Sequence, residues 1–445
     1  MEKEAKGEER VFEAVEKHDV KFIGLWFTDI LGALKSVSIT ISELETAFDE
    51  GMGFDGSSIK GFARIDESDM LAKPDPDTFQ IIPWRPKEAA VARMFCDVLQ
   101  PDGLHYEGDP RYVLKKTLEQ LRQEYGYTFN VGPELEYFYL KNNKSLEVLD
   151  EGGYFDLTTL DAGSDLRRET IAMLVAMGIK VEAGHHEVSP SQHEIDLRYS
   201  DALTMADQVM TYRFVVKEIA QQRGCYATFM PKPIFGVNGS GMHVHQSLFK
   251  GAKNTFFEPE GEFHLSEVAK QYIAGLLRHA PEITSVTNQW INSYKRLVPG
   301  YEAPVYITWA RRNRSTLVRV PMYKLGKEEA TRVEYRSPDP ACNPYLAFSV
   351  MLAAGMAGIK NRYELLPPTE KDVYLMNEVE RKREGIKTLP GSLIEAIVLT
   401  EKSKLVREAL GEHIFQNFMS SKKVEWDRYR VNVTEWELKE YLSVL

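Results

Sequence analysis

A chain of 445 residues is too long for one compact core and predicts two or more domains. Hydrophobic residues at 43% and charged residues at 27% are typical of a soluble globular protein, and the net charge of −11 argues against nucleic acid as the main partner. The charged start of the chain predicts no signal peptide, and the longest apolar run, Leu346 to Ile359, is too short to cross a membrane and predicts a buried helix.

Short helices and strands are predicted along the first part of the chain, where apolar residues recur at helical or strand spacing. The predicted helices are 10–17 and 41–48, and the predicted strands are 20–27, 35–40 and 90–98. A turn at 29–32 separates the first two strands, and Pro74 is expected to start a further strand-rich piece.

The turn cluster Pro101-Asp-Gly103 marks the predicted domain boundary. We expect a small strand-rich domain over 1–103 and a larger domain over 104–445, which begins with a helix at about 110–124. Strands and helices do not alternate regularly after the boundary, so the pattern favours an α+β architecture over a doubly wound parallel sheet.

Gly51-Met-Gly-Phe-Asp-Gly56 fits the G-x-G-x-x-G pattern of dinucleotide-binding folds. That fingerprint requires a strand before it and a helix after it. Here a charged amphipathic helix precedes the glycines and Ser57-Ser-Ile-Lys-Gly61 follows them. We therefore predict no dinucleotide site and interpret the glycines as a mobile loop that presents Asp55.

Asn238-Gly-Ser-Gly-Met-His-Val-His245 combines a flexible turn with two imidazoles. Gly239 and Gly241 allow the backbone to approach a ligand closely. His243 and His245 follow at strand spacing, so both rings face the same side of a sheet. Such a pair either binds a metal or phosphate, or packs and hydrogen-bonds within the sheet.

Two pairs of glutamates precede this segment. Glu134 and Glu136 lie in an aromatic-rich predicted strand, where a spacing of two puts both on one face. Like charges side by side are destabilising unless a cation lies between them, although an exposed strand edge with two solvated glutamates is the alternative. Glu187 and Glu194 flank a Pro-containing loop, which is either metal-binding or an ordinary polar surface loop.

A third predicted strand carries Arg332, Glu334 and Arg336 on one face. This arrangement is either an ion-pair ladder or a metal ligand held among phosphate-binding guanidiniums. Further basic residues precede it: Arg296, Arg311, Arg312, Arg314 and Arg319. In an acidic protein, an Arg-rich stretch beside metal-type carboxylates points to an anionic phosphate as substrate.

The ligand inventory is hard, because it consists of carboxylates and imidazoles. Cys96, Cys225 and Cys342 are scattered, which indicates reduced thiols of a cytoplasmic protein and leaves oxygen and nitrogen to bind any metal. Such ligands suit Mg²⁺ or Mn²⁺ rather than structural zinc, and divalent ions with arginines are what phosphoryl transfer requires. The residues therefore predict a metal-dependent, ATP-using enzyme without a P-loop, and they leave its second substrate open.

At these residues the chain strongly resembles the type I glutamine synthetase family over nearly its whole length. The matching motifs are Phe54-Asp-Gly-Ser-Ser-Ile59, Gly132-Pro-Glu-Leu-Glu136, His186-Glu187 to Glu194, Pro231-Lys-Pro233, Asn238-Gly-Ser-Gly-Met-His243, Lys295-Arg-Leu-Val-Pro-Gly-Tyr-Glu302, Asn313-Arg-Ser315 and Arg332 to Pro340. Several long motifs in the right order are highly specific.

The resemblance implies a small β-grasp-like N-terminal domain and a large catalytic domain with a curved antiparallel sheet and flanking helices. It also implies a homo-dodecamer of two stacked hexameric rings, whose active sites lie between the N-terminal domain of one subunit and the catalytic domain of its neighbour. The expected small-molecule partners are L-glutamate, ammonium and ATP, with nitrogen-regulatory proteins as further partners and with neither nucleic acid nor membrane.

The resemblance further implies a role for each site residue. One metal would be bound by Glu136, Glu187 and Glu194, and the other by Glu134, His243 and Glu334. ATP would be contacted by Glu182, Tyr199, His245, Ser247, Arg314, Arg319 and Arg332. Glutamate would be held by Asn238, Gly239, Arg296, Glu302, Arg314 and Arg336.

The implied reaction forms γ-glutamyl phosphate from glutamate and ATP, and ammonia then attacks the acyl carbon. Asp55 would take a proton from ammonium, Glu302 would close the site against water, and Arg314 would lie between glutamate and phosphate. The alternatives are a ligase that uses another amine and a non-catalytic ring protein. The intact Asp55 and Glu302 motifs favour ammonium, and all six metal ligands are present.

Two residues bear on control. One branch of the family is adenylylated on a tyrosine, but Tyr374 stands at that position in a different sequence context, and we interpret it as an ordinary loop tyrosine. Gly61-Phe-Ala-Arg64-Ile65 matches a motif of the branch that glutamine inhibits directly. We therefore expect Arg64 to be regulatory and glutamine to inhibit the enzyme at the Asp55 loop.

Overall fold

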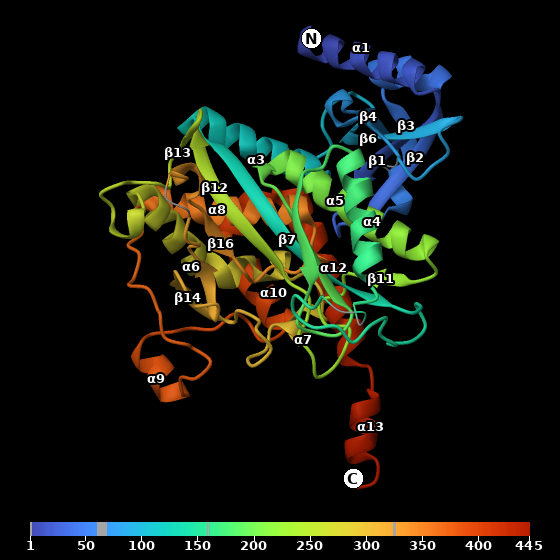
Figure 1. Ribbon diagram of the computed structural model, residues 1–445. Helices are drawn as coiled ribbons and strands as arrows, with labels where there is room; N and C mark the ends of the chain where they lie inside the picture. Colours follow the sequence, from blue (N-terminus) through green and yellow to red (C-terminus); the bar gives the residue numbers. More distant parts are fainter. Residues whose placement is uncertain (1, 60–68, 158, 160, 324–325) are drawn as a thin grey trace.

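Two β-sheets organise the chain, as the computed structural model shows (Figure 1). The structure describes residues 2–59, 69–157, 159, 161–323 and 326–445. The first sheet has the strand order β2-β1-β6-β4-β3, with β5 beside β6, and the second has the order β14-β15-β16-β12-β7-β9-β8, with β10, β11 and β13 at its margins. The mixture of largely antiparallel sheets with segregated helices confirms the α+β expectation.

The first sheet belongs to the N-terminal part of the chain. Its elements are α1 (Glu2–Lys17), β1 (Val20–Thr28), β2 (Leu34–Thr40), α2 (Leu44–Asp49), β3 (Met52–Asp55), β4 (Asp69–Pro74), β5 (Gln80–Ile81) and β6 (Ala90–Leu99). Strands β1 and β6 are parallel, and the β1–β2 turn is closed by Asp29, whose Oδ1 accepts hydrogen bonds from the amides of Leu31 and Ala33. Ile23, Leu25 and Met94 lie in its separate hydrophobic core.

Two local expectations in this part were wrong. Pro74 ends β4 instead of starting a strand, and a 3-10 turn over Pro76–Thr78 follows, capped by Asp75. This is consistent with proline, which has no amide hydrogen to extend a ladder. The glycine segment before Asp55 is also not a loop, because Met52–Asp55 pairs with β4 as strand β3. Helix α2 precedes it, as expected.

The second sheet provides the larger surface. Its main strands are β7 (Thr128–Leu140), β8 (Val181–His186), β9 (Gln192–Leu197), β12 (Met242–Lys250), β14 (Tyr306–Ala310), β15 (Thr316–Arg319) and β16 (Val333–Tyr335), and the marginal ones are β10 (Ser200–Asp201), β11 (Tyr226–Thr228) and β13 (Lys253–Asn254). The pairings are antiparallel except for β14 with β15, which run parallel.

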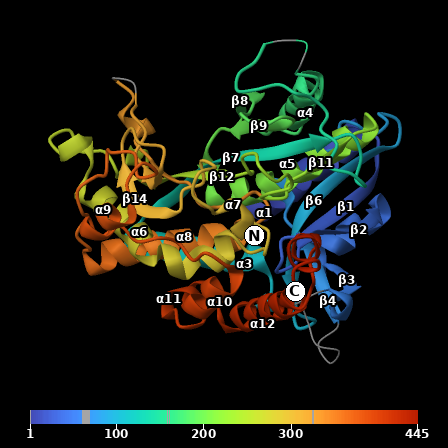
Figure 2. The ribbon, with the colours of Figure 1, turned by 90° about the horizontal axis from the view of Figure 1, so that it is seen from below.

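Helices cover one face of this sheet and fill the main core, as the view from below shows (Figure 2). They are α3 (Pro110–Tyr125), α4 (Ser164–Ala176), α5 (Ala202–Gln222), α6 (Glu267–Thr287), α7 (Ser293–Arg296), α8 (Pro344–Asn361), α9 (Glu378–Arg383), α10 (Leu393–Glu401), α11 (Lys404–Leu410), α12 (Glu412–Arg430) and α13 (Glu435–Tyr441). Helix α8 is largely buried, as its apolar run predicted, and it approaches α6 so closely that a Cβ on Gly358 would lie 1.9 Å from the Gln271 carbonyl oxygen.

A buried ion cluster joins the two sheets. Arg111 at the start of α3 contacts Asp75 at 2.8 Å, Asp97 of β6 at 2.5 Å and Asp207 of α5 at 2.9 Å. The Arg111 side chain is 3% exposed, so its guanidinium exchanges water for three carboxylates. Elsewhere, α13 projects from the body at the C-terminal end (Figure 1), and among the described residues no helix is long and apolar enough to cross a membrane.

Candidate active site

Strand register gathers acidic and imidazole groups on the open face of the large sheet. Glu134 of β7 lies opposite His243 of β12 on one side and opposite Asp196 of β9 on the other. Two residues along, Glu136 lies opposite Glu194. Because side chains alternate along a strand, these pairs share one face. The expectation that Glu134 and Glu136 project together is therefore met.

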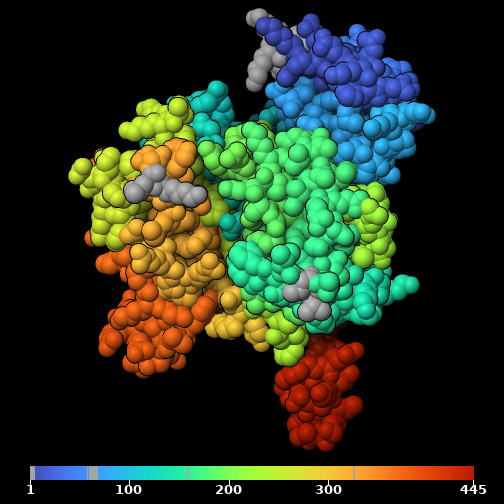
Figure 3. All heavy atoms as spheres, in the orientation of Figure 1, coloured from blue at the N-terminus to red at the C-terminus, as the bar shows by residue number. Residues whose placement is uncertain are grey.

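A cavity of about 1000 Å³ opens at this face. Figure 3 shows the molecular surface hollowed between the lobe that carries α4 and β8 and the lobe coloured yellow to orange. The expected site residues that line the cavity are Glu134, Glu136, Glu187, Glu194, Asn238, Gly239, His243, Arg296, Glu302, Arg314, Arg319, Glu334 and Arg336. Most of the expected metal and glutamate ligands thus converge from sequence positions far apart.

The first metal-type group consists of Glu134, His243 and Glu334, whose ligand atoms lie within 4.8 Å of one another. His243 Nδ1 is 3.4 Å from Glu134 Oε2 and 3.8 Å from Glu334 Oε1. Burial alone would raise the pKa of Glu134, but the charges and hydrogen bonds of His245 and His243 hold it well below its usual value. The pKa of Glu334 is likewise lowered against burial by His245 and Arg336. Both groups are thus carboxylates at neutral pH.

The second metal-type group consists of His185, Glu187 and Glu194. His185 Nε2 lies 2.9 Å from Glu187 Oε1 and 3.6 Å from Glu194 Oε2. Sequence reasoning did not select His185, although its position next to His186-Glu187 in the motif was a usable signal. Glu136, the expected third ligand, lines the same cavity but points its Oε2 at Gln192 Nε2 (2.8 Å) and the Gly241 amide (3.0 Å).

Burial makes this second group hold protons when no cation is bound. Burial and the charge of Glu187 raise the pKa of Glu136 to about 8. Burial and the charge of Glu136 raise the pKa of Glu194 well above its usual value. In addition, one oxygen of Asp196, a residue that sequence reasoning missed, is buried without a hydrogen-bond partner. Such a cluster of carboxylates suits a divalent cation, so the residues present fit the metal that the chemistry requires.

Arginines surround the first metal-type group. Arg319 and Arg336 both ion-pair with Glu334, the latter through Nε at 3.1 Å. Arg336 lines the cavity and is only 6% exposed, and its Nη1 is buried without a hydrogen-bond partner. A buried guanidinium nitrogen with no acceptor is costly, so this donor suits a carboxylate or phosphate oxygen of a substrate.

The segment that carries Glu302 is held at the mouth of the cavity by hydrogen bonds. Asn238 Nδ2 donates to Glu302 Oε2 at 2.9 Å, and the Tyr374 hydroxyl donates to the Ala303 carbonyl oxygen at 2.6 Å. Glu302 has a backbone φ of 57°, which is costly for a side chain other than glycine and which clusters at functional sites. Because the Tyr374 hydroxyl is engaged, the geometry favours its interpretation as an ordinary loop tyrosine.

Other expected site residues lie outside the cavity lining. His245 and Ser247 follow His243 along β12, and Arg332 Nε donates to His245 Nδ1 at 3.2 Å, which leads from the cavity towards the sheet edge. Glu182 is an exposed residue of β8, and Tyr199 is exposed beside Gly132. Asp55 ends β3 in the other sheet, exposed, with Oδ1 accepting from the Ser57 amide. Arg64 lies outside the described residues.

Comparison with known proteins agrees with this arrangement. A family profile described as "Glutamine synthetase, beta-Grasp domain" matches residues 19–101, and one described as "Glutamine synthetase, catalytic domain" matches residues 107–441. A glutamine synthetase of Methanosarcina mazei is 53% identical over 441 residues, which covers 98% of both chains.

Solved structures resemble the fold at lower sequence identity. A cryo-EM structure of Plasmodium falciparum glutamine synthetase has a TM-score of 0.88 at 27% identity and covers 98% of each chain. A structure described as a GmaS/ADP complex has a TM-score of 0.89 at 30% identity and covers 97% of this chain and 99% of that one.

Proposed function

The chain belongs to the glutamine synthetase family and makes glutamine from glutamate, ammonia and ATP, and from that premise we propose which residues perform each step. The family implies a divalent metal and ATP, and the two metal-type groups of the cavity are its candidate ligands. The single observation that supports the assignment most strongly is the convergence of both groups and the arginines on one cavity.

The proposed metals are Mg²⁺ or Mn²⁺, two or more at each site. Glu134, His243 and Glu334 would hold one ion, and Glu187 and Glu194 the other, with Glu136 and His185 as the remaining candidates for that ion. A bound divalent ion would neutralise charge on the phosphoryl group that is transferred. The raised pKa of Glu136 means that its carboxyl gives up a proton when it takes part.

The proposed substrate contacts follow the shape of the site. Glutamate would contact Asn238, Gly239, Arg296 and Arg336, which line the cavity together, with Arg314 between it and the phosphate. ATP would lie towards the sheet edge, with Arg319 in the cavity and Glu182, Tyr199, His245, Ser247 and Arg332 beyond it. The unpartnered Nη1 of Arg336 supports an anion at this position.

The proposed reaction has two steps. The γ-carboxylate oxygen of glutamate attacks the γ-phosphorus of ATP, ADP leaves, and the arginines stabilise the charge of the γ-glutamyl phosphate. Ammonia then attacks the acyl carbon and phosphate leaves, which gives glutamine. Asp55 would accept the proton from ammonium, and Glu302 would keep water from the acyl phosphate.

The test is substitution of Glu334 by glutamine, which removes one charge and nearly preserves shape. We expect glutamine formation to fall by about a hundredfold or more, the scale of a lost electrostatic contact at a phosphoryl transition state. Glu329→Gln is the matched control, because Glu329 is exposed in an ion pair with Lys327. Retention of wild-type activity by Glu334→Gln at saturating metal would refute the assignment. A panel of amines in place of ammonium tests the alternative ligase.

We also propose that the site is shared between subunits of a ring-shaped homo-oligomer, a dodecamer by resemblance. The supporting observation is that Asp55 belongs to the first sheet and does not line the cavity of its own chain. Asp55→Ala and Glu334→Gln subunits, each inactive alone, should then restore activity when co-assembled. Mixed oligomers as inactive as both parents, with mixing verified by mass, would contradict the shared site.

Three further parts of this proposal rest on sequence. The domain boundary is kept near residue 103, between β6 and α3. The cytoplasm is the proposed location, in keeping with Cys96, Cys225 and Cys342, which are free thiols. Inhibition by glutamine through Arg64, and binding of nitrogen-regulatory proteins, remain predictions.

A further inference from the structure

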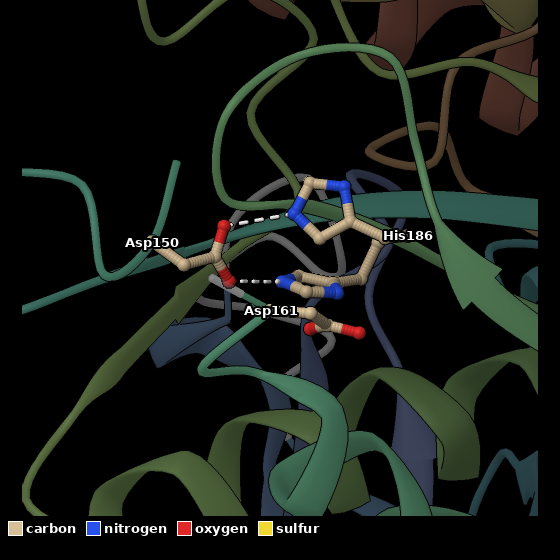
Figure 4. A group of neighbouring side chains, drawn as sticks. Asp150, Asp161 and His186 are labelled. Atoms are coloured by element: carbon tan, nitrogen blue, oxygen red, sulfur yellow. Dashed lines mark hydrogen bonds and ion pairs between the residues drawn. The ribbon is translucent and has the colours of Figure 1, made fainter. Parts of the chain in front are cut away.

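A buried polar cluster lies directly behind the second metal-type group. Asp150, Asp161, His186 and His193 place ligand-type atoms within 4.8 Å of one another, and all four are buried (Figure 4). In the β8–β9 hairpin, His186 pairs with His193 and each immediately precedes a glutamate of the metal-type group, Glu187 or Glu194. Because side chains alternate, the histidines face away from the cavity while the glutamates face it.

One carboxylate contacts both strands and the connecting loop of this hairpin. Asp150 Oδ1 accepts from His186 Nε2 at 2.8 Å and from the Ser191 amide at 2.9 Å, and Oδ2 lies 3.4 Å from His193 Nε2. The Ser191 hydroxyl in turn accepts from the amides of Leu149 and Asp150 at 2.6 and 2.8 Å. Ser191 has a φ of 58°, so the loop holds a conformation that is costly without such contacts.

The network reaches the cavity through the backbone of Glu187. His186 Nδ1 lies 2.6 Å from the Glu187 carbonyl oxygen, while Nε2 of the same ring faces Asp150. Both partners are acceptors, so both ring nitrogens donate. The Glu187 amide also donates to the Gln192 carbonyl oxygen at 2.7 Å. The peptide groups on both sides of the Glu187 side chain are therefore fixed.

The same contacts argue against a cation inside the cluster. Arg167 already supplies a guanidinium, which lies 2.8 Å from Asp161 Oδ2 and 2.7 Å from His193 Nδ1. With Nδ1 accepting from Arg167, the hydrogen of His193 is on Nε2, directed at Asp150. Packing is also tight, since a Cβ on Gly163 would lie 2.5 Å from His193 Nε2. The cluster is thus a hydrogen-bonded support with its own positive charge.

We propose that Asp150 is a positioning residue that, through His186, Ser191 and His193, holds the β8–β9 hairpin so that Glu187 and Glu194 converge on one divalent cation. This inference rests on the proposed function, because it assumes that these glutamates bind metal. Groups that orient metal ligands in this way are worth about 10–100-fold in metal affinity or activity.

The experiment is a Mn²⁺ titration of the full-length assembly without nucleotide, read by the electron paramagnetic resonance of free Mn²⁺. Asp150→Asn is expected to weaken one class of Mn²⁺ sites by about 10–100-fold and to leave the other class unchanged. Its kcat should return at saturating Mn²⁺ with a raised half-saturation concentration, whereas general damage to the fold would lower kcat at every concentration.

Asp161→Asn is the matched control, because it removes a charge from the same buried cluster but from the side that faces Arg167. It should titrate like wild type. Equal shifts in both variants, or no shift in Asp150→Asn, would overturn the proposal. If Asp150→Asn does not fold, His186→Gln replaces it, since it loses the donor to the Glu187 carbonyl, and a wild-type titration would then overturn the proposal.

Glu187→Gln separates this inference from the proposed function. If Glu187→Gln binds Mn²⁺ as wild type does, the glutamate is no metal ligand and the proposed function fails at that site. If Glu187→Gln loses one class of sites and Asp150→Asn loses none, the metal assignment stands and only the role of Asp150 is rejected.

Discussion

Arg111 and the cavity floor both bury several carboxylates, but only Arg111 brings a positive charge of its own. Asp75, Asp97 and Asp207 surround its guanidinium at 2.5–2.9 Å. Glu187 and Glu194 instead contact His185, and Glu136 beside them has a pKa raised to about 8 by burial and by Glu187. The junction is thus electrostatically complete, whereas the cavity takes up protons or a cation. A permanent counter-ion fixes structure, and an exchangeable one permits chemistry.

The largest expected effect comes from removing the built-in cation. Arg111→Met leaves three carboxylates without their partner, and breaking a buried pair in this way costs about 3–5 kcal/mol of unfolding free energy. Urea unfolding measures the loss. Arg122→Met is the control, because Arg122 is exposed in its pair with Glu119. Restoration of wild-type stability by Mg²⁺ would show that the junction is no different from the cavity.

Removing the exchangeable cation should have a smaller effect. At a metal concentration of 100 times Kd, binding stabilises the folded state by about 2.7 kcal/mol, so a chelator should lower the unfolding midpoint accordingly. Glu187→Gln, which lacks one cavity carboxylate of the second group, should respond less. An unchanged midpoint of the wild type in the chelator would contradict the comparison.

The pH dependence should follow the raised pKa of Glu136, which burial and Glu187 bring to about 8. Folded, metal-free protein holds this proton up to about pH 8, whereas the unfolded chain releases it near 4.3, so this contribution to stability is lost as pH rises between these values. Metal competes with the proton, so affinity should rise by up to about tenfold per pH unit towards pH 8 for each proton released. Calorimetry in buffers of different ionisation enthalpy counts these protons. Release of none at pH 7 would contradict this assignment.

The smallest expected effect concerns a neutral contact of the cavity wall. Tyr374→Phe removes the hydrogen bond to the Ala303 carbonyl oxygen, which is worth about 0.5–1.5 kcal/mol. Glutamine formation should fall modestly, because Glu302 next to Ala303 loses a support, and ADP-forming hydrolysis without ammonium should increase. A variant indistinguishable from wild type in both assays would remove Tyr374 from the site.

Sequence reasoning reached much of the site because strand spacing is local information. The alternation of Glu134 with Glu136, and of His243 with His245, is readable from the chain, and the sheet register then brings Glu134 opposite His243. His185 and Asp196 were missed because their importance depends on β8 and β9 pairing beside β7, which no local pattern specifies. Asp150 was missed for the same reason, since it acts from behind the hairpin.

The fold was readable where elements carry strong periodicity and less so where short segments meet. The apolar run of α8 was recognised because it exceeds strand length, and its burial follows from close packing against α6. The segment around Pro74 was misread because a proline can end a strand as well as precede one, and only the pairing of β4 with β6 decides between these.

The pairing of β7 with both β12 and β9 has a consequence for how this chain can vary over evolutionary time. Glu134 and Glu136 are aligned with ligands on both neighbouring strands, so deletion of one residue within β7 would turn both carboxylates to the helix-covered face at once. Point substitutions change the site one group at a time, whereas insertions and deletions in these strands abolish it in a single event. Length variation among homologues should therefore be confined to connecting segments, such as the one between β7 and α4.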